Sequence, residues 1–570
     1  MANKGFFLFL FLPLLLIAQS GLDVTGRVSL RMLNTGYDTT SKIKPDSIPD
    51  SAYAKTTLIP GFEQSLNLAL FARTSKLDMT LLGDIRNNPW NPLNTYQNVT
   101  RLTLNVRYGR NEFILGDFFD AGSELFIQSR EVRGAKADIT FGDLWGSHSY
   151  LRTKFSGGEV QKAFGVGHRL YGLYHQYETS GQYRRYFASG IVRLGDTRYF
   201  DIGLKYLYGK DDQKSISSSI NEPLTNQVAG GEAQIYLWKR RIKFFGEGYL
   251  SRKDTLTATN VKDFAYKGGV DVRYGRMKLV TFYQRLGYDY YSAGYPYLQN
   301  DRQGLKVISA YLQPGMFTFS MEGEQYYDNL NHDATRPRTT TRMAEAGITT
   351  HFKSLPELTL KGRFRDDKSN TILDTVKTDK ISRTAEMRVS FGHGAHRLSF
   401  SALYIKLDDR SVLISGSPVG TEQLVGSVNF YSRPSNYLFL SGGSVYSMLT
   451  LTNQQKNTNV YAYLSGRWDI VPRRLKLEAN MNWIYNDAAN GGYSDMLSDY
   501  NQIQSEISLE YFFNSNISLK LVGGVDRRHM NYTTDQALQV IADPEYGPLF
   551  FNSFESYDGI KYGAEINWIF

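Results

Sequence analysis

Cysteine is absent from the 570-residue chain. Its absence excludes disulfides, thiol catalysis, thiolate metal sites and an N-terminal lipid anchor. Histidine is scarce, with eight residues, and none stands in a metal-ligand motif such as two histidines at helical spacing with a glutamate. The sequence therefore predicts no metal site, no cofactor and no catalytic residue.

Long hydrophobic runs are missing except for one near the start of the chain. This run covers residues 6–18, follows Lys4 and ends at the small-x-small triplet Ala18-Gln19-Ser20. It is too short for a membrane-spanning helix, which needs about 20 residues. The pattern predicts a secretory signal peptide over residues 1–20 and an exported mature chain over residues 21–570.

Blocks of like charge are missing as well. The 65 basic and 56 acidic residues are interspersed, although the formal net charge is +9. Mixed charge of this kind is typical of a solvated surface, so we expect no nucleic-acid partner.

The chain is rich in aromatic residues, at 14%, and in glycine, with 51 residues. Both favour strands and turns over helices.

Short turn signals recur along the chain, most of them roughly 40 residues apart. Gly275-Arg276, Pro314-Gly315, His393-Gly394 and Pro472-Arg473 are examples. Each interval holds two alternating strands of about 10 to 14 residues, which are separated by a longer loop rich in Asn, Asp, Ser, Thr and Gly. This period predicts about 26 strands, with an even number from 22 to 28 as the range.

The strands alternate between apolar and charged residues. In RLKLEANMNWIYND, Leu477, Ala479 and Met481 share one face, while Lys476 and Glu478 share the other. A β-propeller of the same period would place four short strands in each repeat. Since no amphipathic helix pattern offers a cover for the apolar face, lipid must cover it, and a sheet in lipid must close on itself. We therefore predict an all-β fold: one large antiparallel transmembrane β-barrel with short periplasmic turns and long extracellular loops.

The last strand has one apolar face. Read at every second position, it presents Tyr562, Ala564, Ile566, Trp568 and Phe570. With these residues the chain resembles the bacterial outer-membrane β-barrel class over nearly its whole length. The resemblance implies that the last strand closes the barrel and carries the signal read by the barrel-insertion machinery. It also implies the bacterial outer membrane as the location and outer-membrane lipid as a partner.

Two segments leave alternatives open. LGDFFDAGSELFIQSREVRGAKADITFG, residues 115–142, faintly resembles the strand pattern of fimbrial ushers, which are translocation pores. Its other interpretation is a strand pair in which Gly116 and Gly134 relieve crowding at a bulge. Residues 155–182 form either one long loop or an additional hairpin.

Tyr290 and Tyr291 are expected in an interfacial aromatic belt near the long loops.

The charged faces of the strands are predicted to line the lumen. Acidic residues such as Asp271, Glu386, Asp469 and Glu478 accompany the basic ones. Mixed charge suits a wet passage with a mild preference for anions, and equally suits salt bridges that support a large barrel. The predicted basic lumen-lining residues are Arg107, Lys205, Arg273, Arg363, Arg365, Arg388 and Arg467.

The function predicted from these features is a non-enzymatic channel that gives a solute or polymer passage across the outer membrane. No plug domain is expected within the chain. One alternative is an export or assembly pore that a plug or periplasmic partner polypeptide fills. Another is an adhesion or structural barrel with ligand-binding loops. A barrel-embedded hydrolase is a third alternative. His148 and Ser149 could suggest its Ser-His pair, but adjacent residues on a strand point to opposite faces, which makes them a poor pair.

Overall fold

The computed structural model describes residues 23–39, 61–87, 101–171, 176–217, 221–353, 355–371, 377–414, 417–451, 456–489, 499–531 and 556–570. The predicted signal peptide over residues 1–20 lies outside the described residues. Every regular element in the described ranges is a β-strand. Among these residues there is no helix long and apolar enough to cross a membrane.

The strands, in chain order, have the following bounds: β1 (Asp23–Thr39), β2 (Gly61–Arg73), β3 (Leu77–Asn87), β4 (Arg101–Tyr108), β5 (Asn111–Asp120), β6 (Arg130–Gly142), β7 (Ser149–Gln161), β8 (Phe164–Tyr171), β9 (Gln176–Gln182), β10 (Arg184–Asp196), β11 (Phe200–Asp212), β12 (Thr225–Leu237), β13 (Ile242–Asp254), β14 (Val261–Tyr274), β15 (Met277–Leu286), β16 (Arg302–Gln313), β17 (Phe317–Tyr327), β18 (Thr339–Thr350), β19 (Glu357–Ser369), β20 (Asp379–His393), β21 (His396–Ile414), β22 (Ser417–Ser435), β23 (Leu438–Leu451), β24 (Lys456–Val471), β25 (Leu475–Ala489), β26 (Tyr500–Phe512), β27 (Ile517–Met530) and β28 (Tyr557–Ile569).

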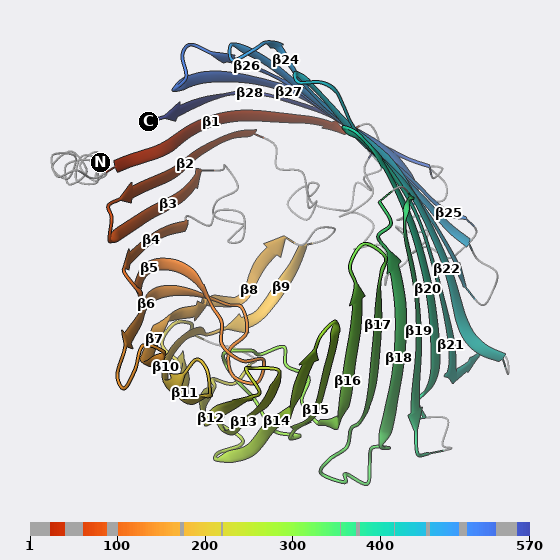
Figure 1. The fold of residues 1–570 in the computed structure, drawn as a ribbon. Coiled ribbons are helices and arrows are strands. Elements are labelled where there is room, and N and C mark those ends of the chain that lie inside the picture. Colours follow the sequence, from red (N-terminus) through yellow and green to blue (C-terminus); the bar gives the residue numbers. More distant parts are fainter. Residues whose placement is uncertain are drawn as a thin grey trace.

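A single antiparallel sheet of 26 strands makes the wall of the barrel. Neighbours in the chain are neighbours in the sheet, except that β7 pairs with β10. The sheet closes where β1 pairs with β28, from Arg27 opposite Ile569 to Thr39 opposite Tyr557 (Figure 1). Closure leaves no open edge, which is the condition for a sheet in lipid. The predicted all-β barrel of about 26 strands is confirmed.

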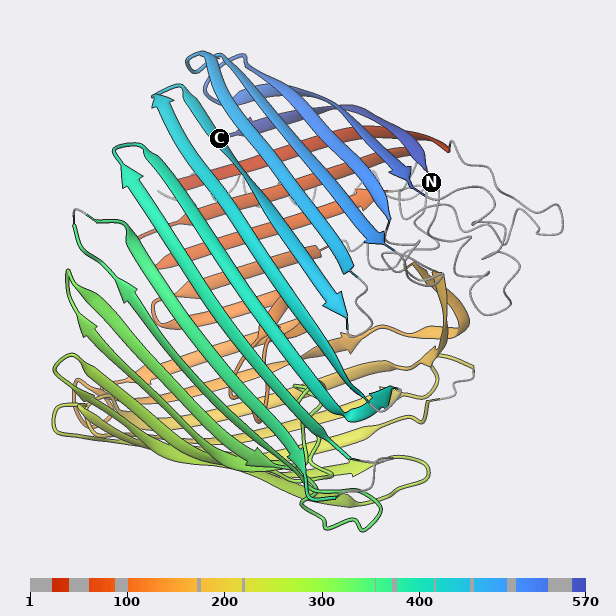
Figure 2. The same ribbon diagram turned by 90° about the vertical axis from the view of Figure 1, so that its right-hand side faces the viewer.

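The two wall faces differ as the alternation predicts. On β11, Leu204 is 69% exposed and points outward, whereas Lys205 and Leu207 are buried on the inside. The register carries this division from strand to strand, so large exposed apolar side chains cover the outside of the ring. The strands are tilted with respect to the barrel axis (Figure 2), as closure of a sheet requires.

One end of the barrel has the short turns. Gly109-Arg110 joins β4 to β5 and Gly275-Arg276 joins β14 to β15, with both glycines at φ near +60°. Two-residue turns with a left-handed residue match the twist of the flanking strands. Most connections at the other end are longer. The exceptions are residues 415–416 between β21 and β22, where the strands themselves reach 19 residues, and residues 452–455 between β23 and β24.

Residues 155–182 contain the additional hairpin that was one of two predicted alternatives. Strands β8 and β9 pair with each other in a separate two-stranded sheet. They are not part of the wall, because β7 and β10 pair directly across their base. The hairpin therefore adds two strands to the chain without adding any to the barrel.

Candidate functional site

The basic residues predicted to line the lumen lie at interior positions of the wall, and each has an acidic neighbour within ion-pair distance. Along these strands they alternate with exposed outward residues such as Tyr108, Tyr274, Phe364 and Trp468. Interior charge is thus compensated locally, and any role of these residues in ion selectivity stays a prediction. The pairs are Arg107–Glu112 at 2.8 Å, Lys205–Glu232 at 2.7 Å, Arg273–Asp271 at 3.1 Å, Arg363–Glu345 at 2.5 Å, Arg365–Asp367 at 2.9 Å, Arg388–Glu386 at 3.5 Å and Arg467–Asp469 at 3.4 Å.

Among the connections that the structure describes in full, two fold into the barrel (Figure 1), and we call them the inner loops. They are residues 121–129 between β5 and β6, and residues 287–301 between β15 and β16. The first inner loop forms a turn in which the amides of Phe126 and Ile127 donate to the carbonyl of Ser123 at 3.0 and 2.9 Å. This turn brings Leu125, Phe126 and Ile127 together, and all three are fully buried.

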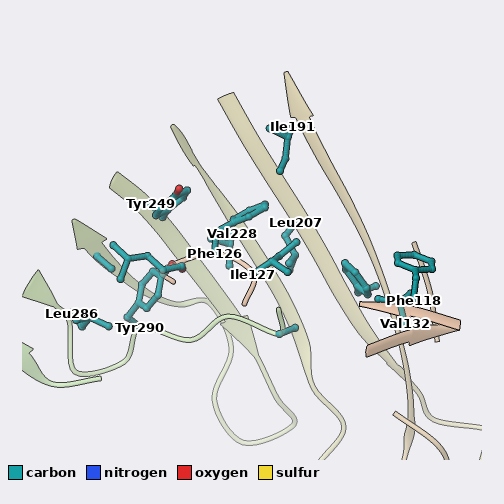
Figure 3. Close-up of a cluster of buried hydrophobic side chains, with 14 of the residues drawn as sticks. Phe118, Phe126, Ile127, Val132, Ile191, Leu207, Val228, Tyr249, Leu286 and Tyr290 are labelled. Atoms are coloured by element: carbon teal, nitrogen blue, oxygen red, sulfur yellow. The ribbon is translucent and has the colours of Figure 1, made fainter. Parts of the chain in front are cut away.

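The inner loops pack against the inside of the wall and form an apolar cluster there (Figure 3). The ring of Phe126 stacks on that of Tyr249, with 5.5 Å between centroids. Leu207 and Val228 from β11 and β12 complete the contact and are fully buried. Burying this apolar surface stabilises the docked loops. We call the interior faces of β10 to β15 the loop-covered arc.

Hydrogen bonds fix the inner loops to each other and to the wall. The Tyr290 hydroxyl donates to the Leu125 carbonyl at 2.5 Å, and the Ser292 hydroxyl donates to the Phe126 carbonyl at 2.5 Å. Burial raises the pKa of Tyr290, so its hydroxyl stays protonated and remains a donor. On the wall, Asn226 on β12 accepts from the Ala293 amide at 2.8 Å.

Lys205 lies at the centre of the contact and is 4% exposed. Its ammonium group donates to Glu232 at 2.7 Å and to the Tyr249 hydroxyl at 3.0 Å. It also lies 5.8 Å from the centroid of the Phe126 ring. Arg193 contacts the same glutamate, so the buried carboxylate has two cationic partners. The prediction that Lys205 lines an open lumen is therefore incomplete, because an inner loop covers it.

A second buried polar group lies beside the first inner loop. Asp120 is fully buried at the end of β5, where it pairs with Lys154 and accepts from Ser156. The Ser156 hydroxyl is also 2.7 Å from that of Ser189, and Lys154 donates to the Ala121 carbonyl at 2.8 Å. These contacts fix the point at which the chain leaves the wall and enters the lumen.

Gly116 and Gly134, which the sequence marked as a place of crowding, lie directly opposite each other on β5 and β6. A Cβ atom would lie 1.8 Å from the Leu102 carbonyl oxygen at Gly116, and 1.9 Å from the Gly157 carbonyl oxygen at Gly134. The crowding is confirmed. The expected bulge is not, because the β5–β6 register runs without a shift.

The placement of Tyr290 in an interfacial belt is wrong. Its side chain is 2% exposed and belongs to the apolar cluster inside the barrel. Leu125, Phe126 and Ile127 are not among the functional residues predicted from the sequence. Three consecutive apolar residues do not fit a strand that alternates between a lipid-facing and a water-facing side. This run of apolar residues could therefore have indicated a segment buried inside the barrel.

The opposite part of the wall has a different interior, which we call the amide arc. It comprises the interior faces of β22 to β26, where amides, hydroxyls and two stacked tyrosines prevail. Tyr461 and Tyr463 stack with 6.0 Å between centroids. Tyr461 donates to Asn482 at 3.0 Å, and Tyr463 donates to Asn429 at 3.1 Å. On β24, Arg467 and Asp469 lie near the short turn to β25.

The possible hydrolase pair has another role. Ser149 is 2% exposed, and its hydroxyl accepts from the Trp145 amide at 2.8 Å and donates to the Gly146 carbonyl at 2.7 Å. These bonds hold the turn between β6 and β7. In the described part of the chain, no group of three or more His, Cys, Asp or Glu side chains could hold a metal ion.

The terminal strand lies where the resemblance implies. Tyr562, Ile566 and Trp568 are exposed on the outer face of β28, which pairs with β27 and β1. Phe570 continues the seam, because its amide donates to the Gly26 carbonyl at 3.0 Å and its ring packs 4.9 Å from that of Trp568. This strand is confirmed as the closing strand, while its use as an assembly signal stays a prediction.

Solved structures that resemble this chain are outer-membrane proteins. The siderophore receptor PirA of Pseudomonas aeruginosa has 11% identity and a TM-score of 0.40, with 96% of this chain and 80% of that chain covered. The copper transporter OprC has 9% identity, a TM-score of 0.43 and the same coverage. A P pilus tip assembly intermediate of E. coli that contains PapC has 10% identity, a TM-score of 0.44, and coverage of 86% and 61%. No protein-family profile matches the chain, and no curated protein does.

At these identities the likeness concerns the fold alone. The closed sheet with its apolar outside and polar inside is the architecture of the bacterial outer-membrane β-barrel class.

Proposed function

We propose that this barrel gives a solute or polymer passage across the outer membrane. The observation that carries the proposal is the combination of a lipid-compatible exterior with a polar interior that the described loops cover only in part. A ring of 26 strands about 4.8 Å apart has a backbone diameter of roughly 50 Å. Barrels of 16 to 18 strands already enclose water channels. The inner loops contact β10 to β15, and the amide arc lies elsewhere on the wall.

The test is a conductance recording from purified protein in a planar bilayer. We expect discrete current steps. Correct folding is checked on the same sample by its migration on a denaturing gel before and after boiling. Folded protein that leaves the bilayer silent would contradict an open passage and would favour a sealed adhesion or structural barrel.

A second candidate is a pore that a partner polypeptide fills. The width of the ring favours it, since the described inner loops contact one arc of the wall. Co-purification from outer membranes distinguishes the two candidates: a stoichiometric partner, together with larger conductance after its removal, supports the filled pore. The Ser149 hydroxyl, which was suggested for a barrel-embedded hydrolase, makes two hydrogen bonds within its turn and is therefore a poor candidate for a nucleophile.

We also propose that β28 is the segment recognised by the barrel-insertion machinery. Its exposed outward face, with Ile566 and Trp568, supports this role. Deleting Phe570, or replacing Trp568 and Phe570 with serine, is expected to abolish insertion. Outer-membrane levels by quantitative blotting provide the measurement, and normal levels of both variants would contradict the proposal.

A further inference from the structure

The inner loops and the wall together line an open pocket inside the barrel. Its volume is about 690 Å³, within the range of roughly 300 to 1,000 Å³ that small-molecule sites occupy. The first inner loop contributes Gln128, and the second contributes Tyr295, Tyr297 and Gln299. The floor consists of interior residues of β14 to β17, which include Phe282 and Gln284.

Aromatic side chains give the pocket flat apolar surfaces. Tyr297 is 83% exposed, although it belongs to a loop inside the barrel. Phe282 lies on the floor, with the Lys267 ammonium 4.4 Å from its ring centroid, and Tyr326 lies 5.9 Å from the Arg302 guanidinium. Exposed aromatic surface in a wet cavity is typical of ligand recognition, because contact with a ligand removes it from water.

The charged groups of the pocket are largely occupied by one another. Lys306 pairs with Glu322 at 2.7 Å and with Glu324 at 3.2 Å. Lys267 pairs with Glu124 at 3.3 Å across to the first inner loop. Because most of this charge is compensated within the protein, the pocket lacks the strong field of one sign that an ionic ligand requires.

The uncharged polar groups complete the pattern. Gln128, Gln284 and Gln299 each offer amide donors and a carbonyl acceptor. A ligand that matches this pocket has an apolar face, which packs on the aromatic rings. It also has many hydroxyl groups, which both donate hydrogen bonds to the side-chain amides and accept hydrogen bonds from them. Sugar rings have these properties, since their C–H bonds form a flat apolar face and their hydroxyls surround it. The amide arc repeats the same chemistry, with stacked tyrosines beside asparagines.

We propose that the pocket between the inner loops and β14 to β17 binds a neutral oligosaccharide. This inference deepens the proposed passage by naming a class of solute, and it rests on that proposal only for the direction in which the sugar travels. Binding itself can be measured on the folded barrel without any current.

The experiment is isothermal titration calorimetry on purified full-length barrel in detergent micelles. Four probes are used: maltohexaose, cellohexaose, hexa-N-acetylchitohexaose and the acidic hexagalacturonate. We expect at least one neutral hexasaccharide to bind, and the affinity for it to fall at least tenfold in Tyr297→Ala and in Gln284→Ala. Tyr297→Trp should retain binding, because it keeps an aromatic surface. Tyr199→Ala is the matched control, since Tyr199 is an exposed tyrosine in a turn at the other end of the barrel.

The outcomes separate the two proposals. Binding without conductance would support the pocket and contradict the passage, whereas conductance without binding of any neutral probe would overturn the pocket alone. Binding of hexagalacturonate only would overturn the neutral class. Binding that Tyr297→Ala and Gln284→Ala leave unchanged would overturn this location. Gel migration before and after boiling confirms that each variant is folded.

Discussion

The loop-covered arc and the amide arc belong to one sheet and differ in what faces them. In the loop-covered arc, Leu207, Val228 and Tyr249 are buried beneath the inner loops, as interior side chains of a soluble protein would be. In the amide arc, Tyr461 and Asn482 bond to each other and stay partly exposed. The difference shows that one part of the barrel interior can be a packed hydrophobic core while another part is a polar surface in contact with water. Strand alternation is the same in both arcs, so the inner loops make the difference.

The largest expected effect comes from a charge in the apolar cluster. Phe126→Asp removes the stacking on Tyr249 and buries a carboxylate beside Lys205, which is already paired with Glu232, and this is expected to cost about 5 kcal/mol of docking free energy for the inner loops. Hydrogen exchange at the amides of residues 125–127 should then accelerate more than a thousandfold.

Tyr461→Asp is the control in the amide arc. Its side chain is partly exposed to the lumen, so exchange in the inner loops should stay at the wild-type rate. Equal acceleration in both variants would contradict the distinction between the arcs.

Two lysine–glutamate pairs compare buried and exposed charge. Lys205→Met leaves Glu232 buried with Arg193 as its remaining partner, and we expect a loss of about 3 kcal/mol in the free energy of unfolding. Lys406→Met breaks an exposed pair with Glu422, and no measurable change is expected. Guanidinium unfolding in micelles measures both, and a larger loss for Lys406→Met would refute the burial argument.

Neighbouring residues on β25 compare the lipid face with the amide arc. Met481→Arg places a charge on the outer face, where Met481 is 46% exposed, and should destabilise the barrel by about 2 to 4 kcal/mol near the bilayer midplane. Asn480→Arg points into the lumen and loses the bond from Ser465, for about 1 kcal/mol. Unfolding in lipid vesicles provides the measurement, and equal losses would mean that the two faces are assigned incorrectly.

The smallest expected effect concerns ion selectivity. Replacing Arg363, Arg365 and Arg388 with glutamate should shift the reversal potential toward cation preference while the barrel stays folded. The wild-type preference should be mild, because each arginine has an acidic neighbour and salt screens charges beyond about 8 to 10 Å. If the triple substitution leaves the reversal potential unchanged, the constriction that selects ions would lie at the inner loops instead.

Much of this architecture could be predicted from local rules. Period-two alternation, as in Leu477 and Glu478, assigns each strand residue to a face, because a wrong register would put charge into lipid. Turn residues such as Gly275 fix the hairpins, and hairpins in series lead to a closed ring. The interior position of Arg363 follows from the same alternation.

The inner loops could not be predicted in this way. Loop sequences have no regular alternation of apolar and polar residues. No local pattern therefore predicts that Phe126 contacts Tyr249, which is 123 positions further along the chain. The hydrogen bond from Tyr290 to Leu125 joins connections separated by eight wall strands. Such contacts depend on the curvature of the completed ring, which brings the two connections to the same place.

The sequence by itself determined a closed antiparallel sheet, its two faces and its closing strand, because alternation and turn chemistry act between neighbours. The tertiary structure alone decided that Lys205 is covered, that Tyr290 lies inside the barrel and that a pocket forms beside Tyr297. These features arise where segments far apart in the chain meet inside the ring, and only closure of the sheet brings them together.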